Sequence, residues 1–199
     1  MRMPAQESQE QESEWLRQAQ NGDASAFARL ADTYKLPVYN LCYRMLGNGP
    51  DAEDATQETF VRVYSKLHTF RPERKLVSWV LSIAAHYCID RLRRRRAPII
   101  SLDDSPDGYE VASRLPEPEE MALRHEARDE VQALVARLAP DYRAPLILHY
   151  WYGMTYNEIA DIMGLTPQAV KTRLHRARQK LAGGEGAKMP MPLEILGVG

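Results

Sequence analysis

Residues 155–181, TYNEIADIMGLTPQAVKTRLHRARQKL, predict two helices joined by a short turn. Thr155 followed three residues later by Glu158 is the pattern of a capping box, in which each side chain bonds a free amide at a helix start. Gly164 ends this helix where a left-handed backbone is needed. The Thr-Pro pair at 166–167 then opens the next helix as N-cap and first helical residue. The stretch therefore predicts a helix-turn-helix.

The second of these helices has two different faces. Val170, Leu174, Ala177 and Leu181 recur at helical spacing and predict a buried stripe, whereas the opposite face is polar and basic without any acid. In helix-turn-helix proteins, such a face reads base edges in the major groove, and its basic residues hold phosphates. The residues predicted to bind DNA are Gln168, Lys171, Thr172, His175 and Arg176, with Arg173 and Arg178 as phosphate or packing residues. The alternative is a solvated basic helix, which the caps, the turn and the acid-free face together disfavour.

The distribution of charge along the chain is more informative than its net charge. With 199 residues and 44% hydrophobic content, the chain can form a core and is long enough for two small domains. The formal net charge is only -1, yet an arginine run at 91–96 and the basic last helix flank an acidic stretch at 103–120. Such asymmetry favours a nucleic-acid partner.

Several other classes of protein receive little support. No apolar run approaches the length of a membrane span, and the polar start MRMPAQESQEQESEW is unlike a signal peptide, so we expect a cytoplasmic protein that is not embedded in a membrane. Cys42 and Cys88 lie in apolar helical patterns and predict buried thiols, with a redox pair as the lesser alternative. The five histidines are scattered and none joins a cysteine at zinc-ligand spacing, so we expect no metal and no cofactor.

The chain divides by composition into five parts. We predict a disordered start at 1–12, a helical domain at 13–96, an acidic proline-rich linker at 97–118, a second helical domain at 119–182 and a flexible tail at 183–199. Breaks in the first domain are expected at 21–22, near Pro37, at 47–50 and at 71–72, which gives four or five helices. Pro145 requires a helix start close by. The fold class is all-α: two small helical domains on a flexible acidic tether.

Two segments of the first domain are candidate binding surfaces. In residues 49–67, helical periodicity leaves Asp54, Gln57, Glu58 and Arg62 facing outward, and this acidic face either docks a basic protein or only complements the helix dipole. Residues 70–96 interleave aromatic and basic residues, which is the chemistry of single-stranded nucleic-acid binding. Trp79, by its spacing, belongs to the core.

Together these segments resemble an extracytoplasmic-function sigma factor, a short member of the bacterial sigma-70 family. GDASAFARLADTY at 22–34 and DAEDATQETF at 51–60 look like the opening and the polymerase-docking helix of region 2. Residues 70–96 are similar to the segment that melts and reads the minus-10 element, and residues 138–181 are similar to region 4, which reads the minus-35 element.

The resemblance implies a polymerase subunit without catalytic residues or a small-molecule substrate. Its partners would be promoter DNA, the clamp helices and flap of core RNA polymerase, and an anti-sigma factor, with nucleoid association when polymerase is bound. The implied docking residues are Asp54, Gln57, Glu58 and Arg62, and the implied minus-10 residues are Phe70, Arg71, Arg74, Lys75, His86, Arg91, Arg93 and Arg94. The loop at 70–78 would hold a flipped base. His86 stands where the family usually has asparagine and Ala85 where a basic residue is common, which leaves the minus-10 preference open.

Two other classes of protein account for less of the sequence. A helix-turn-helix regulator accounts for residues 120–182 but not for the docking-type and aromatic-basic segments before them. A small nuclease would need a metal at Asp103, Asp104 and Asp107, which lie in the linker without a scaffold to hold them.

Overall fold

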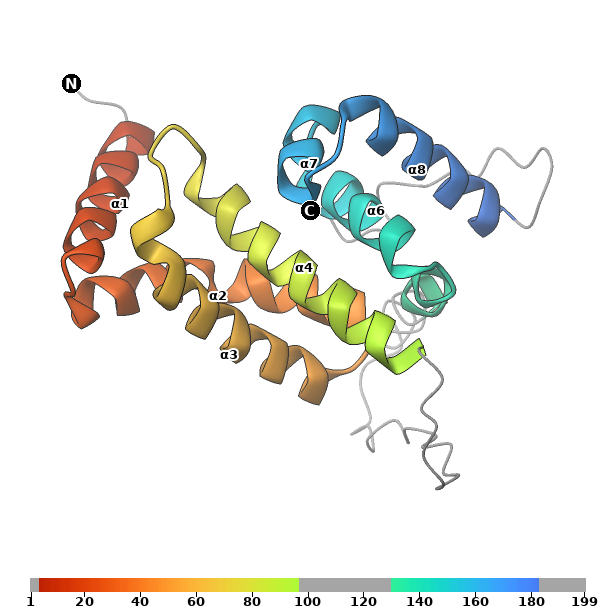
Figure 1. The fold of residues 1–199 in the computed structure, drawn as a ribbon, viewed down its shortest axis with the longest axis horizontal. Helices are drawn as coiled ribbons and strands as arrows, with labels where there is room; N and C mark the ends of the chain where they lie inside the picture. Colours follow the sequence, from red (N-terminus) through yellow and green to blue (C-terminus); the bar gives the residue numbers. More distant parts are fainter. Residues whose placement is uncertain (1–3, 97–129, 183–199) are drawn as a thin grey trace, which may run out of the picture.

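The computed structural model describes residues 4–96 and 130–182, and every regular element in these ranges is a helix (Figure 1). The all-α prediction is confirmed. The predicted linker at 97–118 and tail at 183–199 lie outside the described residues. None of the described helices combines the length and hydropathy that crossing a bilayer requires.

The first group of helices is built from strong local signals. It comprises α1 (Pro4–Gln20), α2 (Ala24–Leu46), α3 (Gly49–Lys66), a 3-10 turn η1 (Leu67–Thr69) and α4 (Leu76–Arg96). The Asp23 carboxylate accepts hydrogen bonds from two amides at the start of α2, and Gly47 ends that helix with a φ of 89°. Asn48 then caps α3, so two consecutive residues turn the chain between the helices.

Two predictions for this group are wrong. Helix α1 begins at Pro4, so most of the stretch predicted to be disordered is helical; its Gln and Glu residues are good helix formers, and Glu12 accepts a hydrogen bond from the Tyr34 hydroxyl on α2. Helix α2 runs through Pro37 without a break. The missing hydrogen bond costs about 3 kcal/mol, which burial of Val38 and Leu41 offsets at roughly 1.5–3 kcal/mol for each side chain.

The second group contains the helix-turn-helix. A helical segment at 130–136 precedes α6 (Pro140–Tyr152), α7 (Tyr156–Met163) and α8 (Pro167–Leu181). The capping box at Thr155, the left-handed Gly164 with a φ of 63° and the Thr166 cap are all confirmed. The predicted stripe on α8 is buried at Val170, Leu174 and Ala177.

Helix α6 contains Pro145 beyond its first turn, and the structure accommodates it through α8. A proline in a helix leaves the carbonyl four residues earlier without its amide donor, which here is the carbonyl of Asp141. That oxygen accepts a hydrogen bond from the guanidinium of Arg173 on α8, at 3.4 Å. The interruption in α6 therefore becomes a contact between α6 and α8.

The two groups pack against each other instead of standing apart. Helix α6 lies against α2 and α4, and α7 lies against α4 (Figure 1). The Tyr152 hydroxyl donates to the carbonyl of Pro37 at 2.5 Å, and the buried guanidinium of Arg143 donates to the carbonyl of Met45. Buried residues of both groups form one continuous core, so the two predicted helical domains lie against each other in the described structure.

Candidate nucleic-acid interface

Helix α8 presents the predicted basic face to solvent. Its exposed side chains include Gln168, Lys171, Thr172, His175, Arg176 and Arg178. Arg173 differs from them: it is half-buried, and its guanidinium lies 3.6 Å from the Asp141 carboxylate as well as bonding the Asp141 carbonyl. Arg173 therefore holds α8 on α6. Of the two roles predicted for Arg173, phosphate binding or packing, these contacts correspond to packing.

The loop between η1 and α4 carries the next group of candidates. Arg71, Arg74 and Lys75 are exposed, whereas Phe70 is buried and its ring centre lies 5.2 Å from that of Trp79. Phe70 was predicted to contact the minus-10 element, but the structure uses its ring to close the core under the loop. Trp79 is partly buried against the core, as predicted.

His86 is exposed on α4. Its Nδ1 lies 2.7 Å from the carbonyl oxygen of Ser82. A carbonyl oxygen can only accept, so Nδ1 carries the proton and Nε2 of the neutral ring remains an acceptor. In its neutral form, the ring therefore offers a hydrogen-bond acceptor at this position.

Two predicted minus-10 cations pair with acids of the second helix group. The Lys75 ammonium lies 2.7 Å from the Glu158 carboxylate on α7, and Arg93 lies 2.7 Å from Asp141 on α6. The Lys75 ammonium and hydrogen bonds from Thr155 lower the pKa of Glu158 to about 2. A cavity of about 200 Å³ lies at this junction of the loop, α4 and α7.

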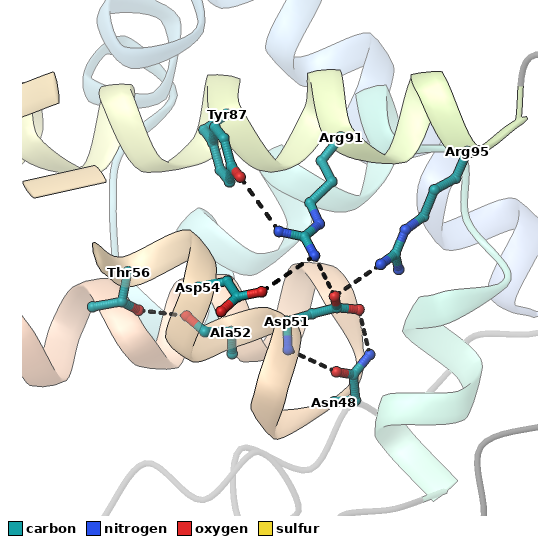
Figure 2. Close-up of polar contacts among 8 residues, drawn as sticks. All are labelled: Asn48, Asp51, Ala52, Asp54, Thr56, Tyr87, Arg91 and Arg95. Atoms are coloured by element: carbon teal, nitrogen blue, oxygen red, sulfur yellow. Dashed lines mark hydrogen bonds and ion pairs between the residues drawn. The ribbon is translucent and has the colours of Figure 1, made fainter. Parts of the chain in front are cut away.

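An ion-pair network ties α3 to α4 (Figure 2). One oxygen of the buried Asp51 carboxylate accepts from Arg91 at 2.5 Å and from Arg95 at 2.8 Å, and the other accepts from Asn48 at 2.7 Å. Burial works to raise the pKa of Asp51, but the hydrogen bonds from Arg95 and Asn48 and the two arginine charges hold it below its usual value. Arg91, predicted to contact DNA, is thus also a structural link.

Sequence reasoning missed this role of Asp51 because an acid in a first helical turn is already explained by the helix dipole. The one available signal was the spacing of Arg91 and Arg95, which places both on one face of α4. Nothing in the local pattern names their partner on another helix.

The predicted docking face lies on α3. Asp54 and Gln57 are exposed, and Glu58 pairs with Arg62 at 2.7 Å. Beside them a groove of about 580 Å³ separates α3 from α2, with Leu36 66% exposed at its edge. Its lining residues are Asp32, Lys35, Leu36, Tyr39, Glu53, Thr56 and Gln57. Exposed apolar and acidic groups in one groove suit a protein partner better than DNA.

The remaining candidates concern metals and thiols. The described residues contain no group of three or more histidine, cysteine, aspartate or glutamate side chains arranged for a metal, and Asp103, Asp104 and Asp107 lie outside them. Cys42 and Cys88 are buried free thiols, as predicted.

Comparison with known proteins identifies the family. The family model for Sigma-70 region 2 matches residues 30–97, and that for Sigma-70 region 4 matches residues 128–181. The ECF RNA polymerase sigma factor SigW of Bacillus subtilis (strain 168) is 35% identical over 173 residues, which cover 83% of this chain and 92% of SigW. The chain belongs to the ECF RNA polymerase sigma factors. It directs transcription initiation by RNA polymerase, and a stand-alone helix-turn-helix regulator does not account for the region 2 match.

Further relatives share most of the sigma factor's length. The RNA polymerase sigma-H factor of Pseudomonas aeruginosa is 29% identical, with 87% of this chain and 93% of the relative aligned. Among solved structures, CnrH in complex with the cytosolic domain of CnrY gives a TM-score of 0.63 at 24% identity, covering 87% of this chain and 96% of CnrH. RpoE in complex with the anti-sigma factor NepR from Bartonella quintana gives 0.59 at 21%, covering 79% and 94%. At these identities the likeness concerns the fold.

Proposed function

We propose that this sigma factor reads a promoter in two places. Helix α8 lies in the major groove of the minus-35 element through Gln168, Lys171, Thr172, His175 and Arg176, with Arg178 on a phosphate. The observation that carries this assignment is the exposed, acid-free face of α8 opposite a stripe that is buried at Val170, Leu174 and Ala177.

Region 2, which we place at 13–96, contacts and melts the minus-10 element. Arg74 and Lys75 on the loop line one cavity with the half-buried Trp79, and Arg71 on the loop and Arg93 and Arg94 near the end of α4 add further positive charge. Since Phe70 is buried, we assign it to support of the loop rather than to base contact. His86 offers an acceptor, which suits the exocyclic amino group of an adenine or a cytosine.

Core polymerase binds on the other side of region 2. Asp54, Gln57 and Glu58, with Arg62, face the clamp helices of the largest subunit, and the groove beside Leu36 extends this surface. Region 4, which we place at 119–182, contacts the flap, and residues 97–118 connect the two regions. The protein acts in the cytoplasm, at the nucleoid when it is bound to polymerase.

DNA binding requires a rearrangement of the described structure. Lys75 and Arg93 pair with Glu158 and Asp141, so DNA phosphates must replace these carboxylates before region 2 can hold a promoter strand. Polymerase, which binds the two regions at separate places, favours this exchange. The structural likeness to RpoE in complex with NepR supports an anti-sigma factor as a further partner. Such a partner stabilises the arrangement in which the two helix groups pack against each other.

Run-off transcription tests the proposal. Purified sigma factor added to sigma-free core polymerase should produce discrete transcripts from fragmented genomic DNA. Binding to the same DNA without any selective initiation, together with failure to retain core polymerase in a pull-down, would refute it.

A further inference from the structure

Cys42 of α2 and Cys88 of α4 meet inside region 2. Both side chains are fully buried, and the two free thiols share a hydrogen bond. Ala84 and Ala85, which lie one turn before Cys88 on α4, are also fully buried, and such small side chains let two helices approach closely. Hydrogen-bonded thiols are near enough for side-chain rotation to bring the sulfurs to bonding distance. The fold therefore brings together two oxidisable side chains that are far apart in the sequence.

Two threonines of α3 make the surroundings of Cys42 polar. Thr56 and Thr59 are buried, and each hydroxyl donates to the carbonyl one turn earlier on α3 at 2.6 Å. Figure 2 shows this bond for Thr56. The same hydroxyls also hydrogen-bond Cys42. A hydroxyl hydrogen rotates to suit its partner, so it can turn from the carbonyl to the sulfur once Cys42 becomes a thiolate.

These contacts make the two thiols unequal. The hydrogen bond from Cys88, together with those from Thr56 and Thr59, lowers the pKa of Cys42 against the effect of burial. The hydrogen bond with Cys42 and burial both raise the pKa of Cys88. The thiolate is the form that attacks an oxidant. Cys42 is therefore the nucleophile of the pair, and Cys88 is placed to react with its oxidised form.

A tyrosine of the second helix group lies near Cys42. The Tyr152 hydroxyl on α6 donates to the carbonyl of Pro37 at 2.5 Å, a little more than one turn before Cys42 on α2. Burial and the charge of a nearby Cys42 thiolate raise the pKa of Tyr152. The rearrangement proposed for DNA binding separates the two helix groups, and Tyr152 would then leave this position. Access of an oxidant to Cys42 would follow that separation.

We propose that Cys42 and Cys88 form a dithiol site that a peroxide oxidises to a disulfide, and that packing of Tyr152 on α2 protects this site. The Cys42 thiolate attacks one oxygen of hydrogen peroxide and the O–O bond breaks, which gives a sulfenic acid and hydroxide. The hydroxide takes up the proton that Cys42 had released. The Cys88 sulfur then attacks the Cys42 sulfur, and the sulfenic hydroxyl leaves with the Cys88 proton as water. Two electrons pass from the thiols to peroxide, which ends as two molecules of water.

The product would tie α2 to α4 by a covalent bond. Helix α2 lines the groove assigned to polymerase, and α4 carries cations assigned to the minus-10 element. Only the protection by Tyr152 rests on the proposed function, since the thiol pair lies within region 2.

Peptide mass spectrometry of the full-length protein tests for the disulfide. Native protein is treated with hydrogen peroxide, free thiols are alkylated, and trypsin digestion follows without a reductant. The chain contains two cysteines, so an intramolecular disulfide can only join the tryptic peptides 36–44 and 76–91. We expect this linked pair, with the same protein oxidised in urea as the control for detection. Its absence from the native sample, or a disulfide between two molecules only, would overturn the proposal.

Single replacements test the roles of the two thiols. In Cys88→Ala, nothing resolves the oxidised Cys42, so peroxide should leave a sulfenic acid that dimedone traps. In Cys42→Ala, dimedone should label Cys88 about tenfold more slowly, because this thiol lacks the threonine contacts. Equal labelling would overturn the assignment of Cys42 as the nucleophile. The experiment on the unmodified protein still decides the proposal if either variant fails to fold.

A matched pair of tyrosine variants tests the protection. Tyr152→Phe keeps the ring but loses the contact with Pro37, so disulfide formation should be about two- to twelvefold faster, the effect of losing one hydrogen bond. Tyr150→Phe removes a hydroxyl from the same helix, where the ring contacts His149, and should leave the rate unchanged. Equal rates for both variants would overturn the protective role. Normal run-off initiation by the reduced protein, with no disulfide after peroxide, refutes only this inference.

Discussion

The contact between Lys75 and Glu158 gives the sharpest prediction about DNA binding by the free sigma factor. We expect Glu158→Gln to increase the affinity of the full-length protein for DNA. Glutamine still satisfies the capping box at Thr155, so α7 keeps its start and only the charge facing Lys75 is lost. The variant therefore isolates the ion pair from the helix cap.

The expected size follows from exposure. The Lys75 side chain is 71% exposed and that of Glu158 is 31% exposed, so the pair belongs to the surface class at about 0.2–1 kcal/mol. If this pair must break before Lys75 meets a phosphate, its removal raises affinity by about 1.4- to 5-fold. The gain should shrink with added salt, since salt weakens the pair in the unmodified protein.

Asp161→Asn provides the matched control. Asp161 is exposed on the same helix and lines the same cavity, so its replacement changes the local charge equally without breaking the pair. Fluorescence anisotropy with labelled DNA, at about 50 mM and about 200 mM salt, measures both variants over the range where phosphate contacts are most sensitive. Equal affinities for E158Q and D161N would refute the idea that this ion pair competes with DNA.

Other predictions concern the core, a turn, acid stability and promoter specificity. Arg143→Met leaves three backbone carbonyls without their donor, two of them in its own region, and should lower the free energy of unfolding in denaturant titrations by about 2–4 kcal/mol. Gly164→Ala should cost about 1–2 kcal/mol in the same assay, purely from its left-handed backbone, since no atom lies within 4 Å of the added methyl. Folding lowers the pKa of Glu158, so its stabilisation is complete above its unfolded value of about 4.3 and is lost as pH falls toward about 2. The stability difference between wild type and E158Q should therefore vanish over that interval, and a constant difference would contradict the assigned ionisation. Arg176→Ala should weaken binding to the cognate minus-35 element by about 1–3 kcal/mol if the contact is bidentate, whereas equal losses on scrambled elements would indicate a phosphate contact.

Local signals allowed the helix-turn-helix to be predicted from sequence. The caps at Thr155 and Thr166 and the left-handed Gly164 depend on residues within one turn of each other, so the sequence contains all the information that sets them. The exposed face of α8 follows from its periodicity for the same reason. Arg173 departs from it because its acceptor comes from a different helix.

Long-range packing decided the features that sequence reasoning missed. Pro37 signals a helix end locally, but the core on both sides of it keeps α2 continuous. Asp51 looks like a dipole-complementing acid, but its partners lie 40 and 44 residues away. The Arg143 contact with Met45 spans 98 residues, and no periodic pattern in either segment points to the other.

The proline in α6 has a consequence for the orientation of α8. Its absent amide leaves one carbonyl open, and Arg173 enters there, so the recognition helix is held at a fixed rotation about its own axis by a gap in its neighbour. Alanine at Pro145 would supply an ordinary helical donor to the same carbonyl, which Arg173 would then share. If α8 reads the minus-35 element as proposed, the base pairs that it faces depend in this way on Pro145.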